Sequence, residues 1–347
     1  MTATHDRDDW PTTGWSSAPP AGLGLDEDAL AEADCRIQAD LVGVHSLVVV
    51  RHKAIGLERY YGGYDARTRF DVRSVTKSVV ATLVGIAVGD GLLSLSQNLG
   101  ELLPDRLPRD GDERLGAITI EHLLTMTAGF AWDDLADWGR LWASDDWLAT
   151  TLRTPLAADP GHRFTYNSGC SHLLSTIVTR VTGKTLAAFA SGRLFGPLGM
   201  SPAPWPQDPH GYSIGGLGLE FRVRDLAKLG LLYLHGGRWA GVQLVPAAYV
   251  AASTTGQSAG GDPEEAAYGY HWWVTSAAGD AAYFAAGYGG QYVYVVPARD
   301  LVVVTTARWQ LPPAETLELH PLIEDIVLAA AQVEGPAQST HVSPPSA

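Results

Sequence analysis

Ser74 and Lys77 are the residues of this sequence whose types and spacing best suit covalent chemistry. They lie three positions apart at the start of the apolar segment 74–90, whose pattern predicts a helix. Residues at i and i+3 share one face of a helix, so the hydroxyl and the amine can meet. The positive end of the helix stabilises a developing alkoxide, and burial under an apolar helix lowers the pKa of an amine. The pair therefore predicts an activated serine nucleophile with a lysine base.

The spacing alone is a weak signal, because a surface lysine that happens to follow a serine gives the same pattern. The chain has four lysines, and Lys77 is the one with a serine three residues before it. The context strengthens the interpretation. Residues 46–52 and 55–61 read as a strand hairpin, and Phe-Asp-Val-Arg at 70–73 then leads into the predicted helix.

This Phe-x-x-x-Ser-x-x-Lys arrangement after a hairpin resembles that of the class C β-lactamases and penicillin-binding-protein-like serine hydrolases. The resemblance implies that Tyr166, in the Tyr-Asn-Ser-Gly run 166–169, is the family tyrosine, with Ser168 in place of the family asparagine. In that role Tyr166 is held partly as a phenolate or relays a proton to the leaving group. The alternative is a core tyrosine with a satisfied hydroxyl. The run is similar to that of the esterase and amidase branches.

A third family element corresponds to residues 286–291, between two strand-like runs. The resemblance implies that the amides of Ser74 and Gln291 form an oxyanion hole, and that small Gly289 and Gly290 let a substrate lie close to the strand. Tyr288 stands where the family has Lys or His, a cation that would grip the carboxylate of a β-lactam. Because Tyr288 is not a cation, its presence at this position argues against β-lactamase activity. The alternative is that residues 287–290 are only a hairpin turn.

The resemblance covers about residues 25–332, with further matching segments at 118–129, 195–200, 216–219, 224–228 and 268–270. As a whole the pattern is similar to that of family esterases and 6-aminohexanoate-dimer hydrolases. This similarity is strong evidence for the fold and weak evidence for the substrate. It implies hydrolysis of a small-molecule ester or amide through a Ser74 acyl-enzyme, with Lys77 and Tyr166 as general base and acid. The alternatives are β-lactamase or D-alanyl-D-alanine peptidase activity, and a non-catalytic acyl-binding or sensor module.

Aromatic residues are expected to line the substrate cleft, Trp132 first among them. A tryptophan-lined cleft suits an apolar or linear acyl substrate, while core packing is the alternative for each ring. The other candidates, besides Tyr288, are Trp138, Trp142, Trp147, Tyr212, Trp272 and Trp273.

Ser213 is a competing nucleophile, because Gly211-x-Ser213-x-Gly215 matches the elbow of the α/β-hydrolases. That elbow needs a buried strand directly before it and a helix directly after it. Here a proline-rich segment precedes it and a glycine-rich one follows. The Ser74 interpretation is therefore preferred.

The elements that must position these residues form a helix, two strands, a large helical block, several strands and a last helix. Helices are predicted over 26–41, 74–90, 119–127, 171–181, 186–194, 223–235 and 315–331, and late strands over 268–274, 281–285, 291–296 and 301–306. This order predicts an α+β fold of the β-lactamase/transpeptidase type. In it, an antiparallel sheet flanked by the N- and C-terminal helices carries an inserted, mainly helical subdomain.

The domain prediction is an irregular arm over 1–24, a hydrolase domain over 25–332 and a disordered tail over 333–347. Within the domain, the α/β part takes about 25–75 and 215–332, and the helical part about 76–214. The chain of 347 residues is 46% hydrophobic, enough for a large core.

Composition argues against several classes of partner. The net charge of −14 disfavours nucleic acid and anionic membranes. No secretory signal or long apolar run is seen, so a soluble, cytoplasmic protein is expected. Cys35 and Cys170 are expected to be unpaired thiols. No metal or cofactor is predicted, and the histidines, His52, His122 and His172 among them, are expected to be structural or surface residues.

Overall fold

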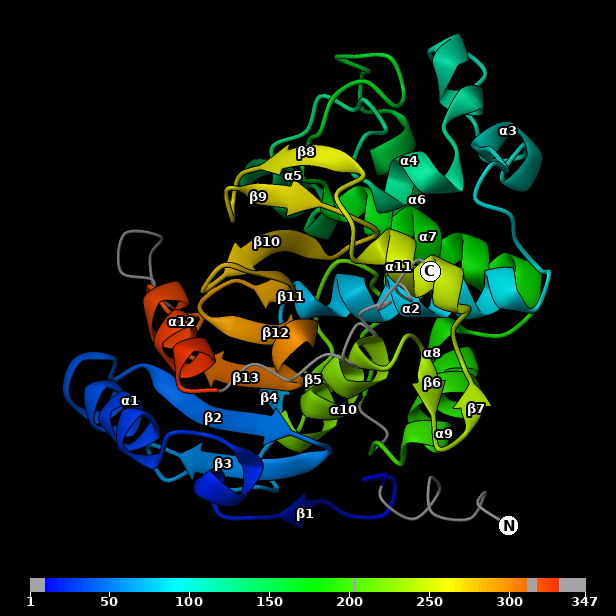
Figure 1. Cartoon of the computed structure of the whole chain (residues 1–347). Coiled ribbons are helices and arrows are strands. Elements are labelled where there is room, and N and C mark those ends of the chain that lie inside the picture. The colour runs from blue at the N-terminus through cyan, green and yellow to red at the C-terminus, as the bar shows by residue number, and fades with distance from the viewer. Residues whose placement is uncertain (1–9, 202–203, 311–316, 331–347) are drawn as a thin grey trace, which may run out of the picture.

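A nine-stranded sheet forms the centre of the computed structural model, which describes residues 10–201, 204–310 and 317–330 (Figure 1). Within those ranges the strand order is β1-β3-β2-β13-β12-β11-β10-β9-β8. Neighbouring strands run antiparallel except β1 (Ser16–Ser17), which is parallel to β3. The other strands are β2 (Val44–Arg51), β3 (Ala54–Tyr60), β8 (Ser258–Gly261), β9 (Ala266–Tyr268), β10 (Trp273–Ala277), β11 (Asp280–Gly287), β12 (Gln291–Val296) and β13 (Leu301–Ala307).

Helices cover both faces of this sheet, which explains why β12 and β13 are buried along their whole length. On one face lies α10 (Val223–Leu234), where a Cβ on Gly230 would sit 2.6 Å from Val302 and 2.9 Å from Val293. On the other face lies α12 (His320–Leu328), where the His320 ring is 4.9 Å from the ring of Tyr292. Because side chains alternate along a strand, successive residues of β12 point toward α10 on one face of the sheet and toward α12 on the other.

The two ends of the chain meet at this sheet. Helix α1 (Glu27–Asp40) lies beside α12, and the Asp26 amide donates to the Ala329 carbonyl at 2.8 Å. Strand β2 pairs with β13 over almost its whole length. The antiparallel sheet flanked by terminal helices is therefore confirmed.

The inserted helical part is built around α2 (Val75–Gly89) and α7 (Ser168–Thr182), which pack against each other. Every residue of α2 from Val75 to Ala87 is buried, as its continuous apolar sequence requires. Figure 1 shows α3 to α7 gathered beyond one end of the sheet. The remaining helices are α3 (Leu99–Leu102), α4 (Ile120–Leu124), α5 (Asp134–Trp142), α6 (Trp147–Leu152), α8 (Leu186–Ala190), α9 (Gly196–Leu198) and α11 (Ala247–Ser253).

A small second sheet ties the start of α2 to a distant segment. Strand β4 (Phe70–Asp71) pairs with β5 (Glu220–Phe221), and the Val72 amide donates to the Leu219 carbonyl at 3.0 Å. The Leu219 amide in turn donates to the Thr76 hydroxyl at 3.2 Å. The strands therefore hold residues 216–221 against the first turn of α2.

Most predicted elements are confirmed, including helices 26–41, 74–90 and 223–235 and the strands at 281–285, 291–296 and 301–306. The first hairpin is also confirmed. Its turn consists of His52 and Lys53, both with positive φ (50° and 61°), as a two-residue turn between twisted strands requires.

Five predicted elements differ from the structure. The helix predicted over 315–331 is shorter among its described residues, since α12 begins at His320 and ends at Leu328. The strand predicted over 268–274 is wrong, because the chain turns back at residues 269–272 and Tyr268 pairs with Trp273. Helix α4 ends at Leu124, and Met126 has φ 57°. Helix α7 begins at Ser168, since the Asn167 side chain accepts from the Cys170 amide at 3.1 Å. The helix predicted over 186–194 passes from α8 into a π-helical turn over Ser191–Phe195.

The N-terminal arm is more ordered than predicted over its described residues 10–24. Residues 16–17 form β1, and Pro20–Leu23 is a 3-10 helix. Trp10 is buried, with its ring 4.8 Å from that of Trp239. The predicted tail 333–347, and residues 315, 316 and 331 of the predicted last helix, lie outside the described residues.

Candidate active site

Ser74 lies at the N-cap of α2, and its hydroxyl faces the Lys77 amine instead of capping the helix. Its side chain makes no capping hydrogen bond to the helix. Instead, Lys77 Nζ donates to Ser74 Oγ at 2.8 Å. The residue before it, Arg73, has φ 49°, so the chain makes a sharp bend into the helix. Ser74 is half-buried, and its amide lies at the start of α2.

Lys77 is buried, with 1% of its surface exposed. Its amine also donates to the Gly216 carbonyl at 2.8 Å, a contact held in place by the β4–β5 pairing. Burial lowers the pKa of Lys77 to about 8, against the opposing attraction of the Asp134 carboxylate and together with repulsion from Arg73. The neutral amine is therefore more populated near neutral pH than that of an exposed lysine.

Tyr166 comes from the loop before α7 and lies against both residues. Lys77 Nζ is 4.8 Å from the centre of its ring, and the Ser74 side chain acts on the pKa of its phenol, lowering it. The ring stacks on Trp273, with centroids 5.7 Å apart. Burial, followed by the negative charge of Asp134, raises the pKa of Tyr166 far above its usual range. The phenol is therefore neutral, which disfavours the phenolate and favours the proton relay.

The predicted substrate-binding Ser168 is the first residue of α7 and is held by Asp134, the first residue of α5. Asp134 Oδ1 accepts from the Ser168 amide at 2.6 Å, and Oδ2 accepts from the Ser168 hydroxyl at 2.9 Å. Sequence reasoning did not identify Asp134. Its local signal was only an Asp-Asp pair that opens a helix.

The predicted cleft tryptophans divide between the site and the core. Trp132 donates from Nε1 to Asp134 at 2.9 Å, and Trp273 supports Tyr166. Trp272 is fully buried against Tyr233, with ring centroids 4.3 Å apart. The remaining three pack edge to face on one another at 5.0 to 5.9 Å, and of these Trp147 is buried in the core while Trp142 is 55% exposed: Trp138, Trp142 and Trp147.

The hairpin between β11 and β12 approaches the Ser74 loop through Gly287. A Cβ on Gly287 would lie 2.3 Å from the Val72 carbonyl oxygen and 3.2 Å from the Arg73 Cβ. Gly289 and Gly290 have φ 90° and 99°, the left-handed backbone that favours glycine, and Tyr288 beside them is 38% exposed.

Gln291, by contrast, is fully buried and its side chain faces the next strand. Its Nε2 donates to the Ala307 carbonyl at 2.7 Å, and its Oε1 accepts from the Ala307 amide at 3.1 Å. Its backbone pairs with Gly287 in the β11–β12 register. Gln291 therefore secures the hairpin to β13.

Buried histidines connect the helices around the site. His271 lies in the β9–β10 turn, where Nδ1 donates to the Leu124 carbonyl at 3.0 Å and Nε2 accepts from Ser171 at 2.9 Å. Burial, followed by repulsion from Lys77, lowers its pKa to about 3, so it is neutral. His172 bonds to Asp208 at 3.0 Å in a pair that is almost fully buried.

Ser213 is buried in the loop before β5, and its hydroxyl has no hydrogen-bond partner among the described residues. Its carbonyl accepts from Ser175 at 2.6 Å. No strand directly precedes it and no helix directly follows it. The nucleophile-elbow interpretation therefore fails on geometry.

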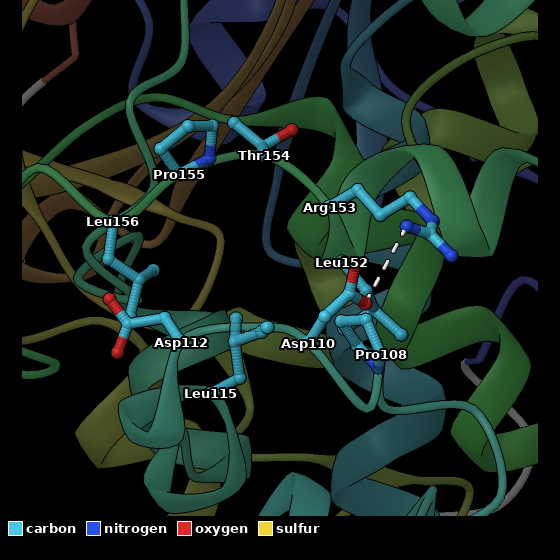
Figure 2. Close-up of a pocket in the computed structure, with 10 residues that line it drawn as sticks. Pro108, Asp110, Asp112, Leu115, Leu152, Arg153, Thr154, Pro155 and Leu156 are labelled. Atoms are coloured by element: carbon cyan, nitrogen blue, oxygen red, sulfur yellow. Dashed lines mark ion pairs between the residues drawn. The ribbon is translucent and has the colours of Figure 1, made fainter.

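A surface hollow of about 350 Å³ lies elsewhere, between residues 108–115 and the end of α6 (Figure 2). Its rim includes Asp110 and Arg153, whose charged groups are 4.0 Å apart. Ser74, Lys77 and Tyr166 are not among the residues that line it. It is therefore separate from the candidate site.

The described residues contain no group of three or more histidine, cysteine or acidic residues that could hold a metal ion. None of their helices is long and apolar enough to cross a membrane. Both cysteines are free thiols, Cys35 exposed and Cys170 buried.

With this geometry in place, comparison with known proteins is decisive for the family. The model of the β-lactamase family matches residues 31–328. The chain belongs to the β-lactamase family. This fold family is one of serine hydrolases, and the matching relatives include proteins named as an esterase and a 6-aminohexanoate-dimer hydrolase.

Two relatives illustrate this range. A 6-aminohexanoate-dimer hydrolase from Paenarthrobacter ureafaciens is 26% identical over 335 residues, covering 90% of this chain and 84% of its own. Esterase EstB from Burkholderia gladioli is 31% identical over 257 residues, covering 66% of this chain and 64% of its own.

Solved structures agree on the fold. A protein described as a proposed 6-aminohexanoate-dimer hydrolase from Bacillus anthracis superposes with a TM-score of 0.75 at 20% identity, covering 93% of this chain and 87% of its own. An octameric penicillin-binding protein homologue from Pyrococcus abyssi gives 0.66 at 20% identity, covering 83% and 74%. The predicted β-lactamase/transpeptidase-like fold is confirmed.

Proposed function

We propose that this serine hydrolase cleaves an ester or a linear amide of a small molecule through an acyl-enzyme on Ser74. The observation that carries the proposal is the 2.8 Å contact between Lys77 Nζ and Ser74 Oγ, made by an amine whose pKa is lowered to about 8. A buried amine of this kind exists partly in its neutral form near neutral pH, which is the form that accepts a proton.

In acylation, neutral Lys77 takes the hydroxyl proton of Ser74 as Oγ bonds to the substrate carbonyl carbon. The neutral phenol of Tyr166 then gives its proton to the leaving oxygen or nitrogen as that bond breaks. Tyr166 regains a proton from the Lys77 ammonium, so the pair returns to its starting state. In deacylation, the same pair takes a proton from water as it attacks the ester, and Ser74 recovers its hydroxyl.

The negative oxygen of the tetrahedral intermediate needs two backbone donors. The Ser74 amide at the start of α2 is one. For the second we favour the amide of Tyr288 over the predicted one of Gln291. Gly287 is the hairpin residue packed against Val72 and Arg73, and Tyr288 follows it directly, whereas Gln291 is buried in the ladder with β11.

Esters and linear amides are favoured over β-lactams for a chemical reason. The hairpin presents Tyr288 where the resemblance would place a cation for the β-lactam carboxylate. Aromatic side chains adjoin the nucleophile, with Tyr166 stacked on Trp273. An apolar wall of this kind suits an uncharged acyl chain.

Intact mass spectrometry tests the proposal. The protein is incubated with p-nitrophenyl butyrate, a linear amide oligomer, a cephalosporin or a D-Ala-D-Ala peptide, quenched in acid and mapped by peptide analysis. We expect transient acylation of Ser74 with turnover of the ester, and loss of both in Ser74→Ala. Ser213→Ala, a buried serine outside the site, should retain both. Acylation at Ser213 would remove Ser74 from the mechanism, and a single stoichiometric burst without turnover would favour the acyl-binding sensor.

A further inference from the structure

Asp134 connects three parts of the candidate site. It lies at the first position of α5, whose N-cap is Asp133. Its carboxylate accepts from the amide and hydroxyl of Ser168 and from the indole of Trp132, at 2.6, 2.9 and 2.9 Å. Ser168 and Asp134 are 34 positions apart in the sequence. The carboxylate therefore fixes one segment of chain to another.

This contact also stabilises the start of α7. The Ser168 amide is among the first N–H groups of that helix, which have no partner inside it. A carboxylate there interacts favourably with the helix dipole. Because Tyr166 lies two residues before Ser168, the same bonds limit how far its phenol can move from Ser74.

The titratable groups around Lys77, Tyr166 and Asp134 come from several elements, and three of them are uncharged. Tyr166 is neutral because burial raises its pKa, and His271 is neutral because burial lowers its pKa to about 3. Cys170 on α7 is a neutral thiol, since burial raises its pKa. Arg73 acts on Lys77 as a cation and Asp134 as an anion. Glu264 acts on Tyr166, and its carboxylate is bonded to Tyr292 and His320.

We propose that Asp134 is a positioning residue of this site: it holds the loop with Tyr166 against α2 and supplies the negative charge that favours the Lys77 ammonium. The inference rests on the proposed function, because it concerns the base of that reaction. The printed hydrogen bonds of Asp134 go to Ser168 and Trp132, so among the described residues it acts on the Tyr166 loop through Ser168 and on Lys77 through its charge. Its two effects, hydrogen bonding and charge, can be separated by substitution.

Asp134→Asn tests the charge, since the amide keeps the shape and an acceptor oxygen. Without the negative charge the Lys77 ammonium is less stable, so the pKa of Lys77 falls. We expect the acidic limb of kcat/KM for p-nitrophenyl butyrate to move to lower pH by roughly one pH unit. Asp134→Glu retains the charge and should leave that limb near its wild-type position, although kcat falls.

Ser168→Ala removes the hydroxyl hydrogen bond to Asp134, while the charge and the backbone amide bond stay in place. Here kcat/KM should fall on the order of tenfold through a misplaced Tyr166, with the acidic limb unmoved. Asp137→Asn is the matched control on the same helix, where the carboxylate bonds to the Asp133 amide and pairs with Arg140. It should leave both the rate and the pH profile unchanged. Circular dichroism shows that each variant is folded.

The outcomes distinguish this inference from the proposed function. If wild-type protein is not acylated on Ser74, the proposed function fails. If wild type is acylated but Asp134→Asn keeps the wild-type pH profile, the charge role of Asp134 is overturned. If Ser168→Ala also keeps the wild-type kcat/KM, the positioning role is overturned as well.

Discussion

The amine of Lys77 is buried against two uncharged oxygens, Ser74 Oγ and the Gly216 carbonyl, each at 2.8 Å. These contacts satisfy two of its donors but give it no carboxylate in direct contact to balance an ammonium charge. Burial therefore destabilises the charged form, and the same property that makes Lys77 a base makes it unfavourable for stability. At the scale of the residue, activity and stability are in opposition.

Replacing Lys77 by methionine should separate the two properties. Acylation is lost, because no base remains. The free energy of unfolding at pH 7 should rise by about 1–3 kcal/mol, since a buried amine is replaced by an apolar chain of similar volume. The pKa of Lys77 is about 8 in the folded protein and ordinarily 10.5. Between these values the unfolded wild type binds more protons, so its stability rises with pH and the advantage of the variant shrinks.

Lys228→Met is the contrasting variant for urea unfolding at pH 7 and pH 10. Lys228 is also buried, but it lies 3.8 Å from the buried Asp225 carboxylate. Its removal leaves that carboxylate without its cation and should lower stability. A lower free energy of unfolding for Lys77→Met than for wild type at pH 7 would contradict the view that the buried Lys77 amine destabilises the fold.

At the scale of the element, the β11–β12 hairpin depends on a glycine that is not required for a turn. Gly287 ends β11, and the Val72 carbonyl oxygen occupies the place of its missing side chain. Any side chain there pushes the hairpin away from the loop before Ser74. The proposed oxyanion donors, one on each of these segments, would then separate.

Gly287→Ala should therefore reduce kcat/KM by at least roughly tenfold while the protein stays folded. Gly192→Ala is the control, because a Cβ at that position meets nothing within 4 Å. Steady-state kinetics and thermal unfolding of both variants test the difference. Equal activity in Gly287→Ala and Gly192→Ala would show that the close contact between Gly287 and Val72 does not position the oxyanion hole.

The same elements show what the sequence could predict. Regular periodicity predicted α2 and β12, whose pattern and burial agree along their length. It failed at 268–274, where a run of aromatic residues hides a turn at Gly269 and His271. Ser74, Lys77 and Tyr166 were found through local motifs. Asp134 was missed because its importance lies in a contact with Ser168, which is distant in sequence.

At the scale of the molecule, the site depends on joining the two ends of the chain. The sheet beneath it pairs β2 with β13, and Arg299 connects the surrounding layers. Its Nε donates to the Asp280 carboxylate at 2.7 Å and its Nη1 to the Val327 carbonyl of α12 at 2.9 Å. Its own carbonyl accepts from Arg51 of β2 at 3.0 Å. One buried guanidinium thus joins a strand turn to the last helix.

Arg299→Met should lower the free energy of unfolding by about 3 kcal/mol, because it removes a buried guanidinium that bonds to the Asp280 carboxylate and to the carbonyls of Val327 and Ala330. Arg36→Met is the matched control. Arg36 also bonds to α12, at 2.8 Å from Asp325, but both side chains are exposed, so the cost should stay below about 1 kcal/mol. Urea unfolding measures both. The folded fraction of Arg299→Met should retain its kcat, since the site lies on other elements; a fall in kcat with unchanged stability would contradict a purely structural role for Arg299.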